Sequence, residues 1–188
     1  MKPIILASTS PRRKELMPFV GEPFVVVQIE TEESLTHTTD GLKAAYDNAL
    51  IKAQAANEHY PNQWILACDT VVAYKGTLLG KPESEAQAIE MLEFLSGKSH
   101  EVISACVLIS PEGEIVKLHD LAQVEFYPLK RREIEAYVDS KEPFGKAGAY
   151  AIQGEAIKFV KRIEGDYASI MGLPVAKLYQ FFQDLKAF

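Results

Sequence analysis

Hydrophobic residues in the first half of the chain fall into short runs, separated by segments with helical spacing. Residues 3–8 (PIILAS) and 24–29 are short apolar runs that predict buried strands. Residues 64–74 (WILACDTVVAY) are apolar nearly throughout, which is typical of a central strand covered on both faces. Residues 40–58 carry apolar side chains at steps of three and four, the pattern of an amphipathic helix. The first half is therefore predicted to alternate strands and helices.

Turn and capping residues add detail to this pattern. Pro11 suits the first turn of a helix, with Ser10 before it as a candidate N-cap. Residues 75–82 (KGTLLGKP) are typical of a turn. Residues 84–95 then predict a helix, and Gly97 suits its C-terminal cap.

The second half combines a hairpin with helices. Residues 100–110 and 115–129 predict two long strands joined around the turn PEGE. Residues 130–140 predict a helix, and residues 142–155 an irregular glycine-rich stretch. Residues 158–172 contain one predicted short strand, and residues 174–185 predict a closing amphipathic helix. The whole pattern predicts a single α/β domain over residues 1–188, with a mixed, elongated central sheet flanked by helices and two lobes around a cleft.

Composition and charge narrow the class of protein. The chain has 188 residues, 47% of them hydrophobic, which is close to the globular average and excludes wholesale disorder. Its 20 Lys and Arg against 26 Asp and Glu give a net charge of −6, which argues against a nucleic-acid-binding protein. The basic residues near the start follow an apolar run too short for a signal peptide or a membrane span. Cys68 and Cys106 lie in apolar runs typical of buried free thiols, so we expect a cytoplasmic protein with no disulfide.

The first candidate for chemistry is the segment from Ser8 to Arg13 (STSPRR), between a predicted strand and a predicted helix. Hydroxyl groups, free backbone N–H groups and two guanidinium groups meet there, and each favours a phosphate oxygen. The segment lacks the glycines and the Lys-Ser/Thr ending of a Walker loop. A capped helix with two solvated arginines is the structural alternative.

The second candidate is Asp69, which interrupts an apolar strand. A buried carboxylate is costly, so Asp69 should lie at a strand end, pair with a base or bind a metal, or else accept backbone N–H bonds in a turn. Glu33 and Asp69 together offer the oxygen ligands that Mg²⁺ prefers, with room for substrate phosphates. Lys52 and Lys81, taken singly, are typical of solvated lysines, yet both could add positive charge to such a site.

Other familiar site types are not indicated. The four histidines are scattered without zinc-ligand spacing. No G-x-S-x-G or GxGxxG motif occurs, which disfavours acyl transfer through a serine nucleophile.

Several motifs together resemble the Maf family of nucleoside triphosphate pyrophosphatases. They are ILASTSPRRKELM, the acidic pair before residue 34, ALIKAQA, CDTVV, GKP, LSGKSHEVISA, AGAYAIQG and IEGDYASIMGLPVAKL. They follow in matching order from about residue 3 to residue 180. The resemblance implies the Maf and Ham1 (ITPase-like) fold, with its active-site cleft.

The resemblance also implies an activity and a set of site residues. The reaction is hydrolysis of a nucleoside triphosphate between its α and β phosphates, with a divalent cation, Mg²⁺ or Mn²⁺, as cofactor. Glu33 and Asp69 would hold the metal, and Asp69 would accept the proton of the attacking water. The residues expected to grip the triphosphate are Ser8, Arg12, Arg13, Lys52 and Lys81.

Three positions separate the branches of this family. Arg12, Thr70 and Gln153 resemble the branch that acts on dTTP and UTP, whereas Trp, Gln and Glu are typical of the branch acting on 7-methyl-GTP. Gln153 can present both a donor and an acceptor to a pyrimidine edge. The sequence departs from the family pattern at 155–158 (EAIK), where glycine-rich text is common.

We therefore expect a cytoplasmic dTTP/UTP pyrophosphatase, tolerant of C5-modified uridine nucleotides, that helps to clear abnormal nucleotides. The alternatives are an ITP, XTP or 7-methyl-GTP pyrophosphatase, and a nucleotide-binding regulator of septum formation. No nucleic acid or membrane partner is expected. A homodimer is left open, and the hairpin and the C-terminal helix, with Leu178, Phe181 and Phe182, offer a contact surface.

Overall fold

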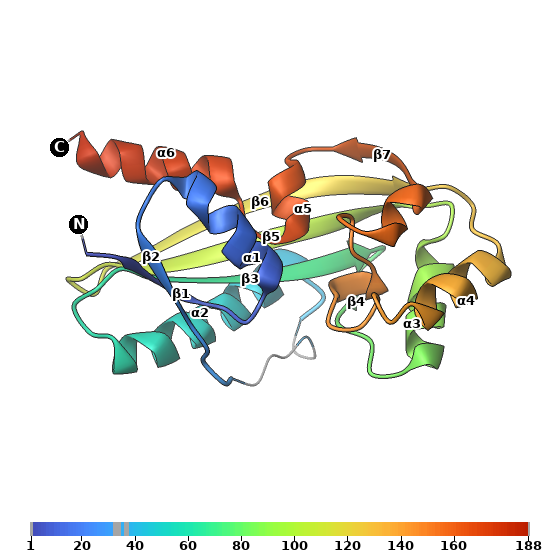
Figure 1. The fold of residues 1–188 in the computed structure, drawn as a ribbon, viewed down its shortest axis with the longest axis horizontal. Coiled ribbons are helices and arrows are strands. Elements are labelled where there is room, and N and C mark those ends of the chain that lie inside the picture. Colours follow the sequence, from blue (N-terminus) through green and yellow to red (C-terminus); the bar gives the residue numbers. More distant parts are fainter. Residues whose placement is uncertain (1, 32–34, 36–37, 188) are drawn as a thin grey trace.

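A seven-stranded mixed sheet runs through the elongated molecule (Figure 1). The protein is described from a computed structural model, which places residues 2–31, 35 and 38–187. The strands are β1 (Ile4–Ala7), β2 (Phe24–Val27), β3 (Ile65–Tyr74), β4 (Thr77–Leu79), β5 (Ser99–Ile109), β6 (Ile115–Phe126) and β7 (Val160–Glu164). Their order is β2-β1-β3-β5-β6-β7, with β4 paired to β3. The mixed sheet expected from the sequence is confirmed.

Helices cover both faces of the sheet. They are α1 (Pro11–Leu16), α2 (Gly41–His59), α3 (Glu85–Leu95), α4 (Arg131–Asp139), α5 (Tyr167–Met171) and α6 (Val175–Lys186). Short 3₁₀ turns follow α1 at 17–20 and occur again at 147–149 and 155–159. None of the helices in the described part of the chain is long and apolar enough to cross a membrane.

The long strand β3 has two different neighbours along one edge. Its first residues pair with β1, in parallel, as far as Ala67. Its last residues pair with β4, antiparallel, from Val72 onward. Among the described strands, none pairs with that edge between these two stretches, at Cys68 to Val71. The middle of β3 can therefore open toward a cavity while its other edge is paired continuously with β5.

Side chains alternate across the sheet and build two hydrophobic layers. Odd-numbered residues such as Ile65 and Ala67 face α2, whose alanines at 49, 53 and 56 are fully buried. Even-numbered residues such as Leu66 and Cys68 face α6 and the turn after α1. Because alanines are small, α2 lies close to the strands, and its longer side chains can reach the middle of β3.

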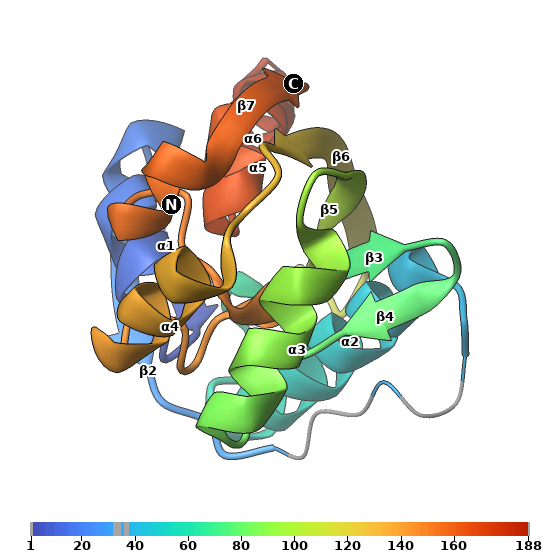
Figure 2. The same cartoon turned by 90° about the vertical axis from the view of Figure 1, so that its right-hand side faces the viewer.

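A separate core lies at the far end of the molecule, where α3 and α4 pack beside the ends of β5 and β6 (Figure 2). Its largest fully buried side chains are Leu92, Leu95, Phe126, Tyr137 and Phe159. The two hydrophobic layers on the sheet form one lobe and this separate core forms the other, which gives the two lobes expected from the sequence.

Several sequence predictions need correction. The segment predicted as a turn contains β4, because three of its residues add to the edge of β3. The sequence did not predict α5, whose five residues are too few for a visible helical period. The strand predicted at 24–29 ends at Val27. Cys68 and Cys106 are free and buried, as expected.

Two of the three α6 residues offered as a contact surface are buried within the protein. Leu178 and Phe182 are fully buried, and Phe182 packs edge-on against Trp64, as does the half-buried Phe181. Leu178 and Phe182 attach α6 to the sheet and are not available to a second copy of the chain, and a homodimer itself stays a prediction.

Candidate active site

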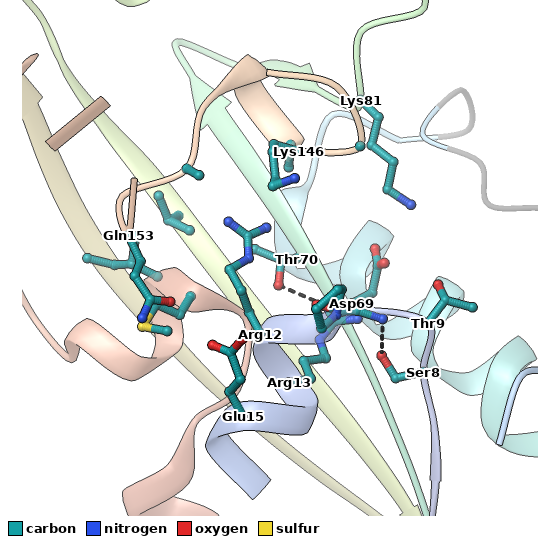
Figure 3. A pocket seen from close by; sticks show the side chains of 18 of the residues that line it. Ser8, Thr9, Arg12, Arg13, Glu15, Asp69, Thr70, Lys81, Lys146 and Gln153 are labelled. Carbon is teal, nitrogen blue, oxygen red and sulfur yellow. Dashed lines mark hydrogen bonds between the residues drawn. The ribbon is translucent and has the colours of Figure 1, made fainter. Parts of the chain in front are cut away.

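A cavity of about 860 Å³ opens beside the unpaired middle of β3 (Figure 3). Segments far apart in the sequence line it: the β1–α1 turn, residues 28–31, α2, β3 and the stretch from 142 to 153. Of the predicted site residues, the following line this one cavity: Ser8, Arg12, Arg13, Lys52, Asp69, Thr70, Lys81 and Gln153. Glu33, the other predicted metal ligand, lies outside the described residues.

Asp69 lies at the floor of the cavity and faces α2. Its Oδ1 accepts a hydrogen bond from Lys52 Nζ at 2.9 Å, and its Oδ2 accepts one from Asn48 Nδ2 at 3.1 Å. Asp69 is only 6% exposed and Lys52 only 9%. The carboxylate is therefore paired with a base, one of the environments expected for it, whereas Lys52 is not the solvated lysine that its sequence context suggests.

Thr70, the next residue of β3, faces the opposite side of the sheet. Its Oγ1 accepts a hydrogen bond from Arg13 Nη2 at 3.1 Å and lies 2.8 Å from Ser104 Oγ. Arg13 Nε donates to the carbonyl oxygen of Gly172 at 2.8 Å. The two neighbouring residues of β3 thus reach α2 on one face and α1 on the other.

The β1–α1 turn supplies polar groups to the same cavity. Ser10 has the extended backbone of an N-cap, but its side chain makes no capping bond, and its N–H donates to Ser8 Oγ at 3.2 Å. Pro11 begins α1, as predicted. Burial, with the neighbouring Arg13 charge, lowers the pKa of the Arg12 guanidinium. A positive group held in partial burial gains from an anion placed beside it.

Lys146 is a cavity residue that the sequence analysis missed. It lies in the stretch predicted as irregular, directly before AGAYAIQG. Figure 3 shows its side chain near Arg12 and Lys81, all pointing into the same opening. Burial, followed by the charge of Arg12, lowers the pKa of Lys146. Its place next to the motif AGAYAIQG is the sequence feature from which Lys146 could have been predicted as a cavity residue.

Asn48 was also missed, although its position could have been inferred. It stands four residues before Lys52 on α2, so both side chains lie on one face of the helix. Since Lys52 reaches Asp69, that face is the one turned to the cavity floor.

Gln153 lies on the outer wall of the cavity, in a turn with a hydrogen-bonded anchor on each side. Tyr137 Oη accepts a hydrogen bond from the N–H of Ala151 at 3.1 Å and donates to Glu142 Oε1 at 2.8 Å. The other oxygen of Glu142 accepts from the N–H of Glu155 at 3.1 Å. The exposed Gln153 side chain is therefore carried by a turn held two residues before it and two residues after it.

Tyr150, in the same wall, is anchored from behind by His100. The two side chains meet at 2.8 Å between His100 Nε2 and Tyr150 Oη. His100 Nδ1 is buried and has no hydrogen-bond partner among the described residues. Burial lowers the pKa of His100 to about 4 and raises the pKa of Tyr150.

A divalent cation fits the residues present at the cavity floor. The described residues contain no group of three or more potential His, Cys, Asp or Glu ligands. However, Mg²⁺ is commonly bound through one or two carboxylates, with water and substrate phosphates completing its shell. Asp69 offers such a carboxylate, since each of its oxygens keeps a lone pair beyond the one that accepts from Lys52 or Asn48.

The fold is that of the Ham1-like α/β proteins, and in this chain a cation-lined cavity lies beside β3 of the mixed sheet. The chain is similar to the Staphylococcus aureus Ham1 protein, with a TM-score of 0.53 at 14% identity, over 97% of this chain and 99% of that one. It is likewise similar to a HAM1 protein from Coxiella burnetii, with a TM-score of 0.54 at 17% identity, over 98% of this chain and all of that one. At these identities the likeness concerns the fold alone.

Within that class, the chain belongs to the Maf family. Residues 3–185 match the family of Maf-like proteins. The chain is 46% identical over its full length to a dTTP/UTP pyrophosphatase of Bacillus mycoides, covering 96% of that protein. It is 44% identical over its full length to a dTTP/UTP pyrophosphatase of Bacillus cereus, covering 91% of that protein. The resemblance seen in the sequence motifs is confirmed.

Proposed function

We propose that this protein is a nucleoside triphosphate pyrophosphatase that hydrolyses dTTP and UTP to the monophosphate and pyrophosphate. The observation that carries the proposal is the buried carboxylate of Asp69 at the floor of a cavity lined by cationic side chains. The names of the full-length relatives support the same reaction and the same substrates.

The cationic side chains suit a triphosphate. Arg12, Arg13, Lys81 and Lys146 line the cavity together with Asp69 and its partner Lys52. Transfer of a phosphoryl group needs little covalent chemistry from the protein, so positioning and charge neutralisation supply most of the catalysis. Guanidinium groups bind phosphate oxygens through paired hydrogen bonds, which orients the chain of phosphates as well as neutralising it.

Asp69 is proposed as the general base. An attacking water gives its proton to the carboxylate as its oxygen bonds to the α-phosphorus. The bond from the α-phosphorus to the bridging oxygen then breaks, and pyrophosphate leaves with the electron pair. Lys52 and Asn48 hold the carboxylate from the side of α2, which restricts its rotation and keeps it at the cavity floor.

Asp69, with Glu33 as the second expected ligand, would hold a divalent cation. When bound, Mg²⁺ or Mn²⁺ supplies further charge neutralisation on the phosphates.

Gln153 is proposed to read the base. Its amide can both donate to and accept from the edge of uracil or thymine, which present both kinds of group. Apolar side chains of Ile152, Ile170 and Met171 line the same cavity and suit the flat face of a ring. A small pyrimidine leaves space at C5, which accounts for the expected tolerance of C5-modified uridine nucleotides. A role in cleaning the cytoplasmic nucleotide pool follows from the same selectivity.

The test is pyrophosphate release from dTTP, UTP, CTP, GTP, ITP and 7-methyl-GTP with Mg²⁺, and again with EDTA. We expect selective cleavage of dTTP and UTP, loss of activity in EDTA, and recovery with Mg²⁺ or Mn²⁺. A preference for ITP or 7-methyl-GTP would leave the proposed reaction in place and overturn the proposed preference for a pyrimidine nucleotide. Activity that persists in EDTA would overturn the proposal that the reaction needs a divalent cation.

Release from no nucleotide would favour the alternative of a nucleotide-binding regulator of septum formation. That role stays a prediction, and a strain carrying Asp69→Asn separates it from catalysis. A division phenotype retained by the variant would assign it to binding, and one lost with hydrolysis would assign it to the enzyme.

A further inference from the structure

The motif EGDYASIMG at residues 164–172 contributes little to the cavity surface beyond two apolar side chains. It forms the short helix α5, which Asp166 caps by accepting hydrogen bonds from the N–H and the hydroxyl of Ser169, at 2.8 and 2.7 Å. Two carbonyl groups at the end of α5, those of Ser169 and Gly172, accept hydrogen bonds from outside the helix. Both connect to Arg13, one directly and one through a chain of hydroxyl groups.

The direction of each hydrogen bond in that chain can be assigned. Ser104 Oγ lies 2.6 Å from the carbonyl oxygen of Ser169, which can only accept, so the single hydroxyl proton of Ser104 points there. The contact of 2.8 Å between Thr70 and Ser104 must then be donated by Thr70. The proton of Thr70 is thereby used, and its oxygen accepts from Arg13 Nη2. The relay runs from Arg13 through Thr70 and Ser104 to Ser169.

The relay is buried and closely packed. Ser104 and Ser169 are fully buried, so water does not replace these bonds at little cost. Gly172 adopts a φ of +112°, and a Cβ there would lie 3.3 Å from both Arg13 Nε and Thr70 Oγ1. Glycine is therefore needed both for the backbone conformation and for the close approach of the arginine.

The relay holds one side of the Arg13 guanidinium and leaves the other for a ligand. Nε and one N–H of Nη2 are engaged, whereas Nη1 has no hydrogen bond among the described residues. Arg13 lines the cavity, so the remaining N–H groups can serve a phosphate.

We propose that Thr70 and Ser104 are positioning residues that orient Arg13 toward the triphosphate through α5. On this assignment Thr70 donates no hydrogen bond to the nucleobase of the substrate, because its single hydroxyl proton is donated to Ser104. This inference rests on the proposed function, since it assumes that Arg13 meets phosphate.

The test is a double-mutant cycle. Thr70→Val keeps the side-chain shape and removes the hydroxyl, and Ser104→Ala removes the next member of the relay. Each is made alone and together with Arg13→Met, and kcat/KM for pyrophosphate release is measured with dTTP, UTP, GTP and ITP. Thr77→Val, an exposed threonine on β4, is the matched control. Melting temperatures report any loss of folding.

We expect Thr70→Val and Ser104→Ala each to lower kcat/KM about tenfold, by the same factor for every nucleotide, because the triphosphate is common to all. Thr70→Ser should recover most of that loss. In the Arg13→Met background neither change should add more than a twofold loss. Equal losses in both backgrounds, or a changed ratio between nucleotides, would overturn the relay and assign Thr70 a structural or base-contacting role.

Binding of inorganic tripolyphosphate, measured by calorimetry, separates this inference from the proposed reaction. If no nucleotide is hydrolysed, the proposed function fails, and the same cycle in tripolyphosphate affinity still decides the relay. Weaker binding in Thr70→Val that disappears in the Arg13→Met background would support it. Failure of the wild-type protein to bind tripolyphosphate would overturn it.

Discussion

The floor and the outer wall of the cavity are built in different ways. The floor, with Asp69 and Lys52, stands on the long elements β3 and α2, and its polar groups are buried. The outer wall, residues 142–153, has only a short 3₁₀ turn and carries the exposed Gln153. It is held from behind by hydrogen bonds to Tyr137 and His100, and by one from the N–H of Gly148 to the carbonyl oxygen of Gly80. The group proposed for bond cleavage thus stands on rigid elements, and the group proposed for base selection on a turn.

This difference has a physical reason. A general base must lie within hydrogen-bond reach of one water molecule, and small displacements are costly, so it gains from a strand and a helix packed together. A turn is tied to its surroundings at a few points, and its exposed residues can change without disturbing the core. The comparison predicts that changes in the floor act on turnover and changes in the wall act on substrate binding.

The largest expected effect is that of Asp69→Asn. The shape is kept while the proton acceptor is lost, so kcat should fall about 10³-fold with little change in KM. The variant also removes the ion pair between Asp69 and the buried Lys52, so its melting temperature should fall as well. Asp47→Asn is the matched control, because Asp47 pairs with Lys43 on the exposed side of α2. A loss carried by KM alone would contradict the assignment of the base.

The next effect is the pH dependence of stability that comes from His100, which anchors the wall through Tyr150. The pKa of His100 is about 4 in the folded protein, against about 6.5 in an unfolded chain. Between these values the unfolded state binds a proton that the folded state does not, so stability falls as the pH falls from 6.5 toward 4. Above pH 6.5 both states are neutral and the contribution vanishes. The loss amounts to at most about 3 kcal/mol across the window.

Urea unfolding at pH 7, 6 and 5 checks this expectation. His100→Gln should lose part of the slope of stability with pH, although it is less stable than the wild type at pH 7. His59→Gln, at an exposed position near the end of α2, should keep the slope. An unchanged slope in His100→Gln would show that the His100 and Tyr150 pair does not titrate as described.

Lys146→Met should have a smaller effect, on binding. Removing one cation from the cavity should raise KM for dTTP about tenfold and leave kcat within a fewfold of the wild type. Lys161→Met is the control, because Lys161 is an exposed residue of β7 that pairs with Glu125 on β6. A kcat effect as large as that of Asp69→Asn would place Lys146 with the floor and break the comparison.

The smallest expected effect is that of Gln153→Ala. Because the side chain is exposed, its loss should raise KM for dTTP and UTP by only about threefold to tenfold, and it should reduce their advantage over ITP. Gln54→Ala, at an exposed position on α2, should change neither. Equal loss for every nucleotide would move Gln153 from base recognition to support of the wall.

Much of this protein could be predicted from local patterns in the sequence. The strands 4–7 and 65–74 are continuous apolar runs, and the helix 41–59 and the hairpin have enough residues for a visible period. The charged residue inside an apolar strand and the cluster before Pro11 marked the candidate site for the same reason, because each departs from the pattern around it. Family motifs then assigned roles that the periodicity could not.

Only the tertiary structure determined which residues meet. The bond from Arg13 to Gly172 joins positions 159 residues apart, and Lys146 reaches the cavity from a segment with no regular pattern. The short helix α5 also depends on distant partners, through its contacts with Arg13 and Ser104. A local pattern reports which face of an element is buried, but it carries no information about the element packed against that face. For that reason the sequence named the residues of the floor, whereas the relay behind Arg13 and the anchors of the wall emerged only from the fold.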